Sequence, residues 1–252
     1  MQKELVMVSD RRWLKAQVYE RAHWQSIADK IASGVMHHLD WYEWKAGQFE
    51  KKIAKYFDFA NEVNCKILEI GSGPIGIVSF LNWGQRYAVD PLEGFYRTKN
   101  ELIHLRNGRV RYLSGQAENL PFEDNQFSIA IIDNVIDHTQ SPKRVLQEIS
   151  RVLKQGCMMF FTVNIHTKWG VLLYSMIQLL QLDKGHPHSF SYKSIRELLN
   201  SHGFAIAYEE LEDYGQIKKR NCHSKHLKDK LKGYSGISDI LYTSVCRKIS
   251  IS

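Results

Sequence analysis

The stretch that decides the fold runs from Lys66 to Gly76 and reads Lys-Ile-Leu-Glu-Ile-Gly-Ser-Gly-Pro-Ile-Gly. Its first half is an apolar run typical of a buried strand, and its second half is rich in glycine. Because glycine lacks a Cβ atom, the backbone turns sharply there and lets a ligand approach the main chain. The stretch predicts a strand, a tight ligand-binding loop and the start of a helix.

The glycines of this loop, Gly71, Gly73 and Gly76, satisfy the G-x-G-x-x-G spacing of dinucleotide-binding loops. Glu69 argues against a dinucleotide, because such folds usually keep an apolar residue at that place in the strand. A carboxylate inside a buried strand costs free energy unless hydrogen-bond donors face it. We therefore expect specific donors near Glu69, and NAD stays an alternative ligand.

Four further segments follow the loop in an order and spacing that one protein family shares. They are 87–91 (Tyr-Ala-Val-Asp-Pro), 115–122 (Gly-Gln-Ala-Glu-Asn-Leu-Pro-Phe), 127–138 (Phe-Ser-Ile-Ala-Ile-Ile-Asp-Asn-Val-Ile-Asp-His) and 145–156 (Val-Leu-Gln-Glu-Ile-Ser-Arg-Val-Leu-Lys-Gln-Gly). With the acidic-x-Gly-x-Gly pattern of the loop, they resemble the class I S-adenosylmethionine (SAM)-dependent methyltransferases. The resemblance covers residues 64–165 closely and 190–248 loosely. It indicates a fold and a cofactor, but no particular acceptor.

Strands and helices alternate from Cys65 onward, a pattern typical of a parallel sheet with crossover helices. We predict an α/β, Rossmann-like fold with a seven-stranded, mostly parallel sheet and helices on both faces. The expected strands are 65–70, 86–90, 109–113, 127–133, 157–163, 204–211 and 240–248. Ser141 and Pro142 predict the start of one helix, and Gly156 predicts its end.

Residues 1–60 are expected to form an N-terminal helical cap on a main domain that spans 61–252. The apolar residues that recur in the first part of the cap at helical spacing are Leu14, Val18, Ala22, Ile27 and Ile31, and four of the six tryptophans of the chain fall in the cap. These aromatic side chains either pack the cap against the main domain or line the acceptor pocket.

An insertion at 166–190 interrupts the alternating pattern of the main domain. Its run from Trp169 to Leu182, about fourteen residues and mostly apolar, is shorter than the roughly 20 residues of a membrane span. We expect a helical lid or a dimer-contact helix. An interfacial membrane helix, aided by a basic segment elsewhere in the chain, is the alternative.

Most of the positive charge lies in one segment. The chain carries a formal net charge of +7, and residues 216–236 alone contribute +6. We expect 212–238 to form a basic loop or helix on an otherwise nearly neutral domain. A solvated surface is one interpretation; a phosphate-bearing or acidic partner and nucleic acid are the others.

The resemblance implies that one set of residues surrounds SAM: Glu69, Gly71, Ser72, Gly73, Asp90, Pro91, Leu92, Gln116, Ala117, Glu118, Asp133 and Asn134. It implies that Asp90 accepts hydrogen bonds from the ribose hydroxyls. Glu69 would orient the methionine end, or would only tie the glycine loop together. Asp133 and Asn134 would face the sulfonium. Gln116 departs from the family, which often has Asp there, although an amide oxygen also suits the adenine amino group.

The candidate catalytic residues are histidines. Methyl transfer is an in-line displacement, so much of its rate comes from holding the acceptor atom in line with the methyl group. A general base is needed only when the acceptor atom arrives protonated, and histidine titrates near neutral pH. His138, directly after the fourth expected strand, is the preferred candidate, and His186 and His188 are further ones. Capping, packing or a surface position is the alternative for each.

Cysteine usage indicates a reducing compartment. The four cysteines form no C-x-x-C pair, and Cys222 with His223 and His226 lacks a second pair at zinc spacing, so we expect no metal. Residues 1–8 lack the pattern of a secretion signal. A cytoplasmic location is therefore expected.

These observations predict a SAM-dependent methyltransferase that transfers a methyl group to an O or N atom of a small-molecule acceptor and leaves S-adenosylhomocysteine. The acceptor would be a metabolite, a sugar or a natural-product intermediate, because a cap and a lid favour an enclosed pocket. Alternatives are an RNA or protein methyltransferase that uses 216–236, an inactive SAM-binding scaffold with a partner protein, and lipid modification at a membrane surface. A homodimer through the cap or the lid would be compatible with any of them.

Overall fold

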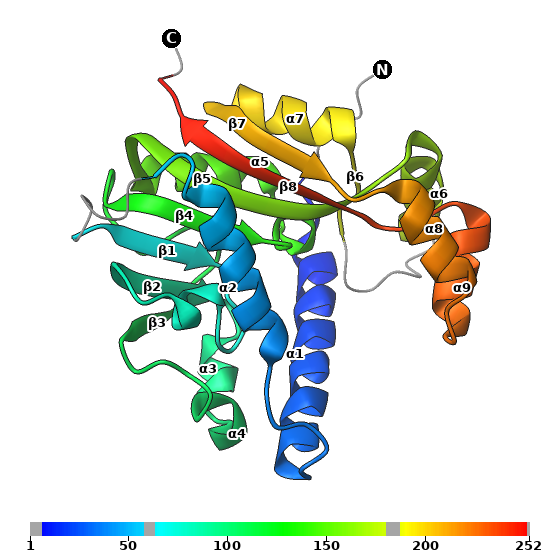
Figure 1. Ribbon diagram of the computed structural model, residues 1–252, viewed down its shortest axis with the longest axis horizontal. Coiled ribbons are helices and arrows are strands. Elements are labelled where there is room, and N and C mark those ends of the chain that lie inside the picture. The colour runs from blue at the N-terminus through cyan, green and yellow to red at the C-terminus, as the bar shows by residue number, and fades with distance from the viewer. Residues whose placement is uncertain (1–6, 58–63, 180–186, 251–252) are drawn as a thin grey trace.

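One mixed sheet organises the molecule (Figure 1). The structure is a computed structural model that describes residues 7–57, 64–179 and 187–250. The sheet has the order β3-β2-β1-β4-β5-β8-β7, and a short β6 pairs with β5 off this path. The strands are β1 Lys66–Ile70, β2 Gln85–Asp90, β3 Val110–Ser114, β4 Phe127–Asp133, β5 Leu153–His166, β6 Phe190–Ser191, β7 Phe204–Leu211 and β8 Ile240–Lys248. The α/β, Rossmann-like prediction is confirmed, with eight strands in place of seven because two residues at Phe190–Ser191 pair with the end of β5.

Strand direction explains where a ligand would bind. The strands β1 to β5 run parallel to their neighbours, whereas β8 is antiparallel to both β5 and β7. The carboxyl ends of β1, β2 and β4 therefore lie side by side at one end of the sheet. In open parallel sheets, ligands bind at the carboxyl ends of the strands, at the point where the strand order reverses.

Helices cover both faces of the sheet (Figure 1). They are α1 Asp10–Ala32, α2 Asp40–Ile53, α3 Glu93–Tyr96, α4 Asn100–Ile103, α5 Pro142–Val152, α6 Lys168–Leu179, α7 Tyr192–Ser201, α8 Tyr214–Cys222 and α9 Leu227–Ser235, with short 3₁₀ turns η1 Ile77–Phe80 and η2 Ile136–His138. Among the helices of the described ranges, none has the length and apolar character needed to cross a membrane.

The strands carry a core on each face because successive side chains point to opposite sides. Leu68 and Ile132 belong to the core that includes α5 and α7, whereas Ile67 and Ile131 belong to the core under α1 and α2. All four side chains are fully buried. The apolar runs of β1 and β4 are therefore buried on both faces, as central parallel strands are.

The two helices of the cap pack on the sheet through a face that the sequence only partly indicates. Leu14 and Val18, expected on the buried face of the first helix, are 55% and 69% exposed. Ile27, which belongs to the same expected pattern, is buried, and so are Ala16 and Trp24. The prediction was wrong for Leu14 and Val18 because the face of α1 that turns inward also borders a polar cavity, so its pattern is not purely apolar.

The end of α5 differs from the prediction. Its start is confirmed, since the Ser141 hydroxyl accepts from the Arg144 N–H at 3.4 Å and Pro142 is the first helical residue. The helix ends at Val152 rather than near Gly156, and β5 begins directly at Leu153. Gly156 has φ +75° within β5, where the pairing with β4 shifts register. The glycine thus serves an irregular strand rather than a helix end.

Candidate active site

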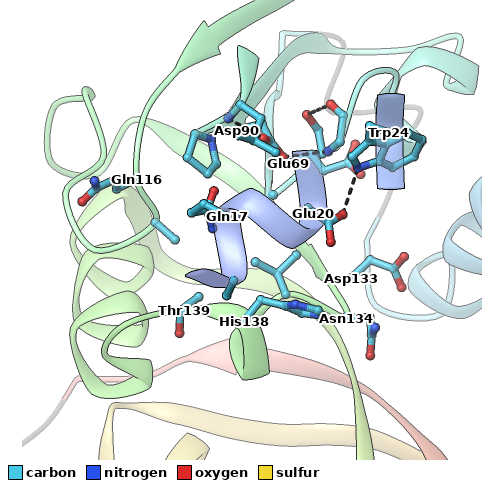
Figure 2. A pocket seen from close by; sticks show the side chains of 18 of the residues that line it. Gln17, Glu20, Trp24, Glu69, Asp90, Gln116, Asp133, Asn134, His138 and Thr139 are labelled. Carbon is cyan, nitrogen blue, oxygen red and sulfur yellow. Dashed lines mark hydrogen bonds between the residues drawn. The ribbon is translucent and has the colours of Figure 1, made fainter. Parts of the chain in front are cut away.

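A cavity of about 490 Å³ lies at the carboxyl ends of β1, β2 and β4 and is bordered by α1 and α2 of the cap. This volume is in the range of pockets for small molecules and cofactors. Figure 2 shows α1 crossing the cavity, with side chains from the strand ends around it. Elements that are distant in the sequence therefore build a single site.

All the residues that the family resemblance implied for SAM line this one cavity: Glu69, Gly71, Ser72, Gly73, Asp90, Pro91, Leu92, Gln116, Ala117, Glu118, Asp133 and Asn134. They come from four separate segments, and the strand order brings them together. Their individual contacts with SAM stay predictions.

The glycine loop makes the sharp turn that its sequence predicts. Gly71 and Gly73 have φ of +68° and +62°, a region that glycine occupies without strain. The Gly73 N–H donates to Asp90 Oδ2 at 2.9 Å, and the Tyr42 hydroxyl donates to the Ser72 carbonyl at 3.1 Å. A Cβ atom on Gly73 would lie 2.5 Å from that hydroxyl. The loop is therefore held between the end of β2 and the cap.

Glu69 ties the glycine loop to the strand before it. Its two carboxylate oxygens accept from the Ile77 and Val78 N–H groups at 3.0 and 2.9 Å. Burial raises the pKa of Glu69 to about 8, although these two bonds oppose the shift. Glu69 therefore has the loop-tying role that the sequence left as an alternative, and it also borders the cavity.

Asp90 is an acceptor at the end of β2. Its carboxylate accepts from Gly73 N and, at 2.8 Å, from Leu92 N. Burial raises the pKa of Asp90 to about 6, against the lowering effect of the two backbone bonds. An ionised carboxylate offers about four acceptor positions, so this one keeps acceptor capacity for the hydroxyls of a ligand.

The segment after β3 supplies a wall of the cavity, but its polar side chains are partly engaged elsewhere. The Glu118 Oε1 atom accepts from Gln140 N at 2.6 Å and Ser141 N at 3.1 Å, and thus orders the loop before α5. Gln116 is exposed, and its backbone bridges to Asn119. Gln116 is therefore free to turn toward a ligand, whereas Glu118 has a structural task as well.

The cap contributes polar residues that sequence reasoning missed. Gln17 and Glu20 of α1 and Lys45 of α2 line the cavity, together with the buried Trp24 and Tyr42. The Trp24 indole N–H donates to Glu20 Oε1 at 2.9 Å (Figure 2). Gln17 Oε1 is buried without a hydrogen-bond partner in the described structure. Polar residues of an amphipathic helix usually face solvent, so the sequence did not indicate that Gln17, Glu20 and Lys45 line a cavity.

The site residues fit SAM by their chemistry. Pro91, Leu92 and Ala117 offer apolar surface for an adenine ring, and Asp90 offers a carboxylate for ribose hydroxyls. The orphaned Gln17 oxygen needs a donor, which a hydroxyl or amino group would supply. When bound, SAM supplies an electrophilic methyl group on a positively charged sulfur.

The end of β4 holds an ion pair next to the loop that follows it. The Asp133 carboxylate accepts from the Thr162 hydroxyl at 2.6 Å and pairs with the Lys45 ammonium of the cap. Asn134 has φ +56°, and its side-chain oxygen accepts from Asn164 N at 3.1 Å. The Asn134 amide oxygen is thus already bonded to β5, while the Asp133 carboxylate links sheet and cap.

Of the two candidate bases that the structure describes, His138 and His188, only His138 lines the cavity. Its Nε2 lies 3.9 Å from Asp137 Oδ1. His188 is 8% exposed and is not among the lining residues. Its backbone N–H donates to the carbonyl of Asp137 in η2 at 3.2 Å. Burial lowers the pKa of His188, which favours its neutral form. His186 lies outside the described residues.

The fold is the Rossmann-like fold of the class I SAM-dependent methyltransferases. Residues 68–161 match the family model described as a methyltransferase domain. The thiol S-methyltransferase TMT1B of Rattus norvegicus is 30% identical over 115 residues, which are 44% of this chain and 46% of that protein. The chain spans at most about half the length of the curated relatives it matches.

Solved structures share the fold over most of the chain. A putative sarcosine dimethylglycine methyltransferase from Galdieria sulphuraria is 18% identical, with a TM-score of 0.58, and the match covers 80% of this chain and 86% of that one. A chain in the complex of the Haloferax volcanii Trm112 methyltransferase activator with a putative methyltransferase is 15% identical, with a TM-score of 0.60, covering 92% and 98%.

Proposed function

We propose that the protein transfers the methyl group of SAM to an oxygen or nitrogen atom of a small-molecule acceptor. The observation that carries this proposal is the position of the cap. Helices α1 and α2 border the cavity beside the residues at the end of β4, so an acceptor has to fit beneath helices to reach the reacting centre. A metabolite, a sugar or a natural-product intermediate satisfies that requirement more easily than a macromolecule.

The residues at the end of β4 support proton handling and positioning. His138 borders the cavity and is a suitable acceptor for the proton of a hydroxyl or ammonium group. The ion pair of Lys45 with Asp133 places a cation and an anion at the same edge. Lys45 would orient an acidic or hydroxyl-bearing acceptor, and Asp133 would favour a positive charge in its vicinity.

Related proteins widen the set of acceptors to be tested. Curated relatives of this chain include a thiol S-methyltransferase and, in Aphanothece halophytica, a sarcosine/dimethylglycine N-methyltransferase at 27% identity over 107 residues. Sulfur and nitrogen acceptors therefore both belong in the screen with oxygen acceptors. An RNA or protein methyltransferase and an inactive SAM-binding scaffold are the alternatives. Each predicts a different result in the acceptor screen.

The first experiment is isothermal titration with SAM, S-adenosylhomocysteine and, as a control, NAD. We expect micromolar binding of SAM and S-adenosylhomocysteine that Asp90→Ala abolishes, and no binding of NAD. Transfer of a labelled methyl group is then measured with panels of hydroxyl, amine and thiol compounds, bulk RNA and peptides. Labelling of RNA or peptides alone would contradict a small-molecule acceptor. Binding of SAM without any transfer would favour the scaffold, and no SAM binding would overturn the proposal.

A further inference from the structure

Helices α6 and α9 carry a group of large apolar side chains that face water. Trp169 and Leu172 of α6 are 55% and 56% exposed, and Leu227, Leu231 and Tyr234 of α9 are 72%, 61% and 74% exposed. We call these five residues the α6–α9 face. Scattered exposed apolar residues are normal on protein surfaces, but gathered ones mark interaction sites.

The face is continuous. Leu227, Leu231 and Tyr234 are spaced four and three residues apart, so they lie along one side of α9. The Trp169 indole N–H donates to the Ser235 carbonyl at 3.2 Å, which joins α6 to the end of α9. Figure 1 shows α6, α8 and α9 together at one end of the molecule, beyond the sheet.

The helices that present this face form a defined unit. A Cβ atom on Gly233 would lie 2.8 Å from the Cys222 N atom, so α8 and α9 cross at close range. Asn221 Nδ2 donates to the Ser238 hydroxyl at 2.9 Å, and the Tyr214 hydroxyl donates to the Gly236 carbonyl at 3.1 Å. The apolar residues are thus held on a fixed support, although nothing in the described chain covers them.

Positive charge surrounds the α6–α9 face. The exposed basic residues of α8, α9 and their connection are Lys218, Lys219, Arg220, Lys225, Lys228 and Lys230. Within the described part of the chain, none of these six pairs with a carboxylate, whereas Lys232 pairs with Asp239. An exposed apolar stripe bordered by lysines is the composition of helices that lie in a membrane interface.

Three partners are candidates for this face: a second copy of the chain, nucleic acid and a lipid surface. The charge of the face distinguishes them. A second copy of the chain would bring two basic surfaces of the same sign together, which disfavours self-association. Nucleic acid would neutralise the lysines but would leave leucines in contact with water or phosphate. An anionic lipid surface suits both the lysines and the apolar side chains, because its headgroups attract the lysines and its acyl region accommodates the apolar side chains.

We propose that the α6–α9 face docks on an anionic lipid surface. Trp169, Leu172, Leu227, Leu231 and Tyr234 enter the interface, and the surrounding lysines and Arg220 contact the headgroup phosphates. The docking is separate from methyl transfer, since the face does not line the SAM cavity. It extends the proposed function by placing the protein at a membrane.

The test is co-sedimentation of the whole protein with vesicles of phosphatidylcholine alone or of phosphatidylcholine mixed with phosphatidylglycerol. We expect binding to the anionic vesicles that weakens as salt is added, and little binding to the neutral ones. Each basic residue near such a surface contributes on the order of 1 kcal/mol, or about fivefold in partition. Lys218→Glu combined with Lys219→Glu and Arg220→Glu is therefore expected to lower the partition coefficient at least tenfold.

Matched variants separate the face from overall charge. Lys143→Glu with Arg144→Glu and Lys154→Glu changes the net charge equally at exposed positions on and just after α5, and is expected to retain most vesicle binding. Equal loss in this control would overturn the proposal, because generic attraction would then explain the binding.

The apolar contribution is tested in the same way. Leu227→Ser with Leu231→Ser is expected to lower vesicle binding, whereas Leu14→Ser with Val18→Ser, at exposed positions of α1, is expected to leave it unchanged. SAM titration of each variant reports on folding and on the cofactor site independently. Absence of vesicle binding by the unaltered protein would overturn the proposal. A dimer in light scattering that the Leu227 and Leu231 changes dissociate would overturn it in favour of self-association.

Discussion

Two buried carboxyl groups at the glycine loop show how the backbone assigns different tasks to similar side chains. Glu69 uses both oxygens on consecutive N–H groups of η1, and so its main contacts are internal. Asp90 divides its oxygens between the loop and its own turn and borders the cavity. The first group holds the loop, and the second is placed to meet a ligand as well.

Protonation of Asp90 is expected to control SAM affinity. With a pKa of about 6, the carboxyl is mostly ionised at pH 7 and mostly protonated at pH 5. Because ribose hydroxyls donate to the ionised form, affinity should fall as the pH falls, by up to about tenfold over this interval. Isothermal titration at both pH values measures it. In Asp90→Asn, binding at pH 7 should be weaker and the pH dependence smaller, so an unchanged pH dependence would contradict the assignment.

The cavity-lining residues that the sequence predicted are marked by short motifs, whereas the lining residues that it missed are not. Gly71, Asp90 and Asp133 each lie at the end of a strand or directly after one, and short motifs mark such positions. Gln17 and Lys45 reach the cavity only because the cap folds over the sheet, a long-range arrangement without a local motif. For the histidines, the local signal was only partly sufficient. The position of His138 directly after β4 correctly predicted that it lines the cavity, but no local motif indicates that His188 is buried.

At the scale of elements, the cap helix α1 combines packing with contact to the cavity. Trp24 and Ile27 are buried, while Gln17 and Glu20 border the cavity from the same helix. The sequence left packing and pocket lining as alternatives for the aromatic residues of the cap. Both occur, because Trp24 is buried and also lines the cavity.

Replacing Gln17 should separate ligand binding from stability. Its buried Oε1 has no partner in the described structure, so Gln17→Ala removes an unsatisfied group and should leave the melting temperature unchanged or slightly higher. SAM affinity should fall by about tenfold, the usual contribution of a single hydrogen bond. Calorimetry and thermal unfolding measure the two effects. Gln25→Ala, which removes an exposed bond to Asp29 on the same helix, is the control and should not alter SAM binding.

The sequence predicted the boundary of an element correctly where a local interaction determines that boundary. The Ser141 cap and Pro142 fixed the start of α5, since both act within one turn. The end of α5 depends on where β5 begins to pair with β4, which is a tertiary event. Gly156 therefore suggested a helix end that the sheet overrides.

At the scale of the whole molecule, burial of Glu69 couples stability to pH. Its pKa is about 8 in the folded protein against an ordinary value of 4.5. Between these values the unfolded chain is ionised while the folded protein still holds the proton. The stability that the raised pKa provides is therefore complete below about pH 4.5 and is lost as the pH rises toward 8.

Urea unfolding at pH 5 and pH 8 tests this coupling. The free energy of unfolding of the unaltered protein, relative to Glu69→Gln, should decrease by a few kcal/mol between these conditions. Glutamine does not titrate, so groups such as His166 and His188 affect both proteins alike and cancel in the difference. A difference that is constant with pH would show that Glu69 is ionised in the folded protein throughout this range.

The position of β8 has a consequence for how the protein is made. This strand follows all the others in the sequence, but it lies between β5 and β7 and is the partner of both. A nascent chain that has not yet released Ile240–Lys248 from the ribosome leaves the 14-residue strand β5 without its antiparallel partner along Met158–Ile165. Such edges recruit strands from other chains. Synthesis therefore includes an interval in which β1 to β7 are present but the sheet ends at β5 and β7 lacks its partner, and protection by chaperones would matter most then.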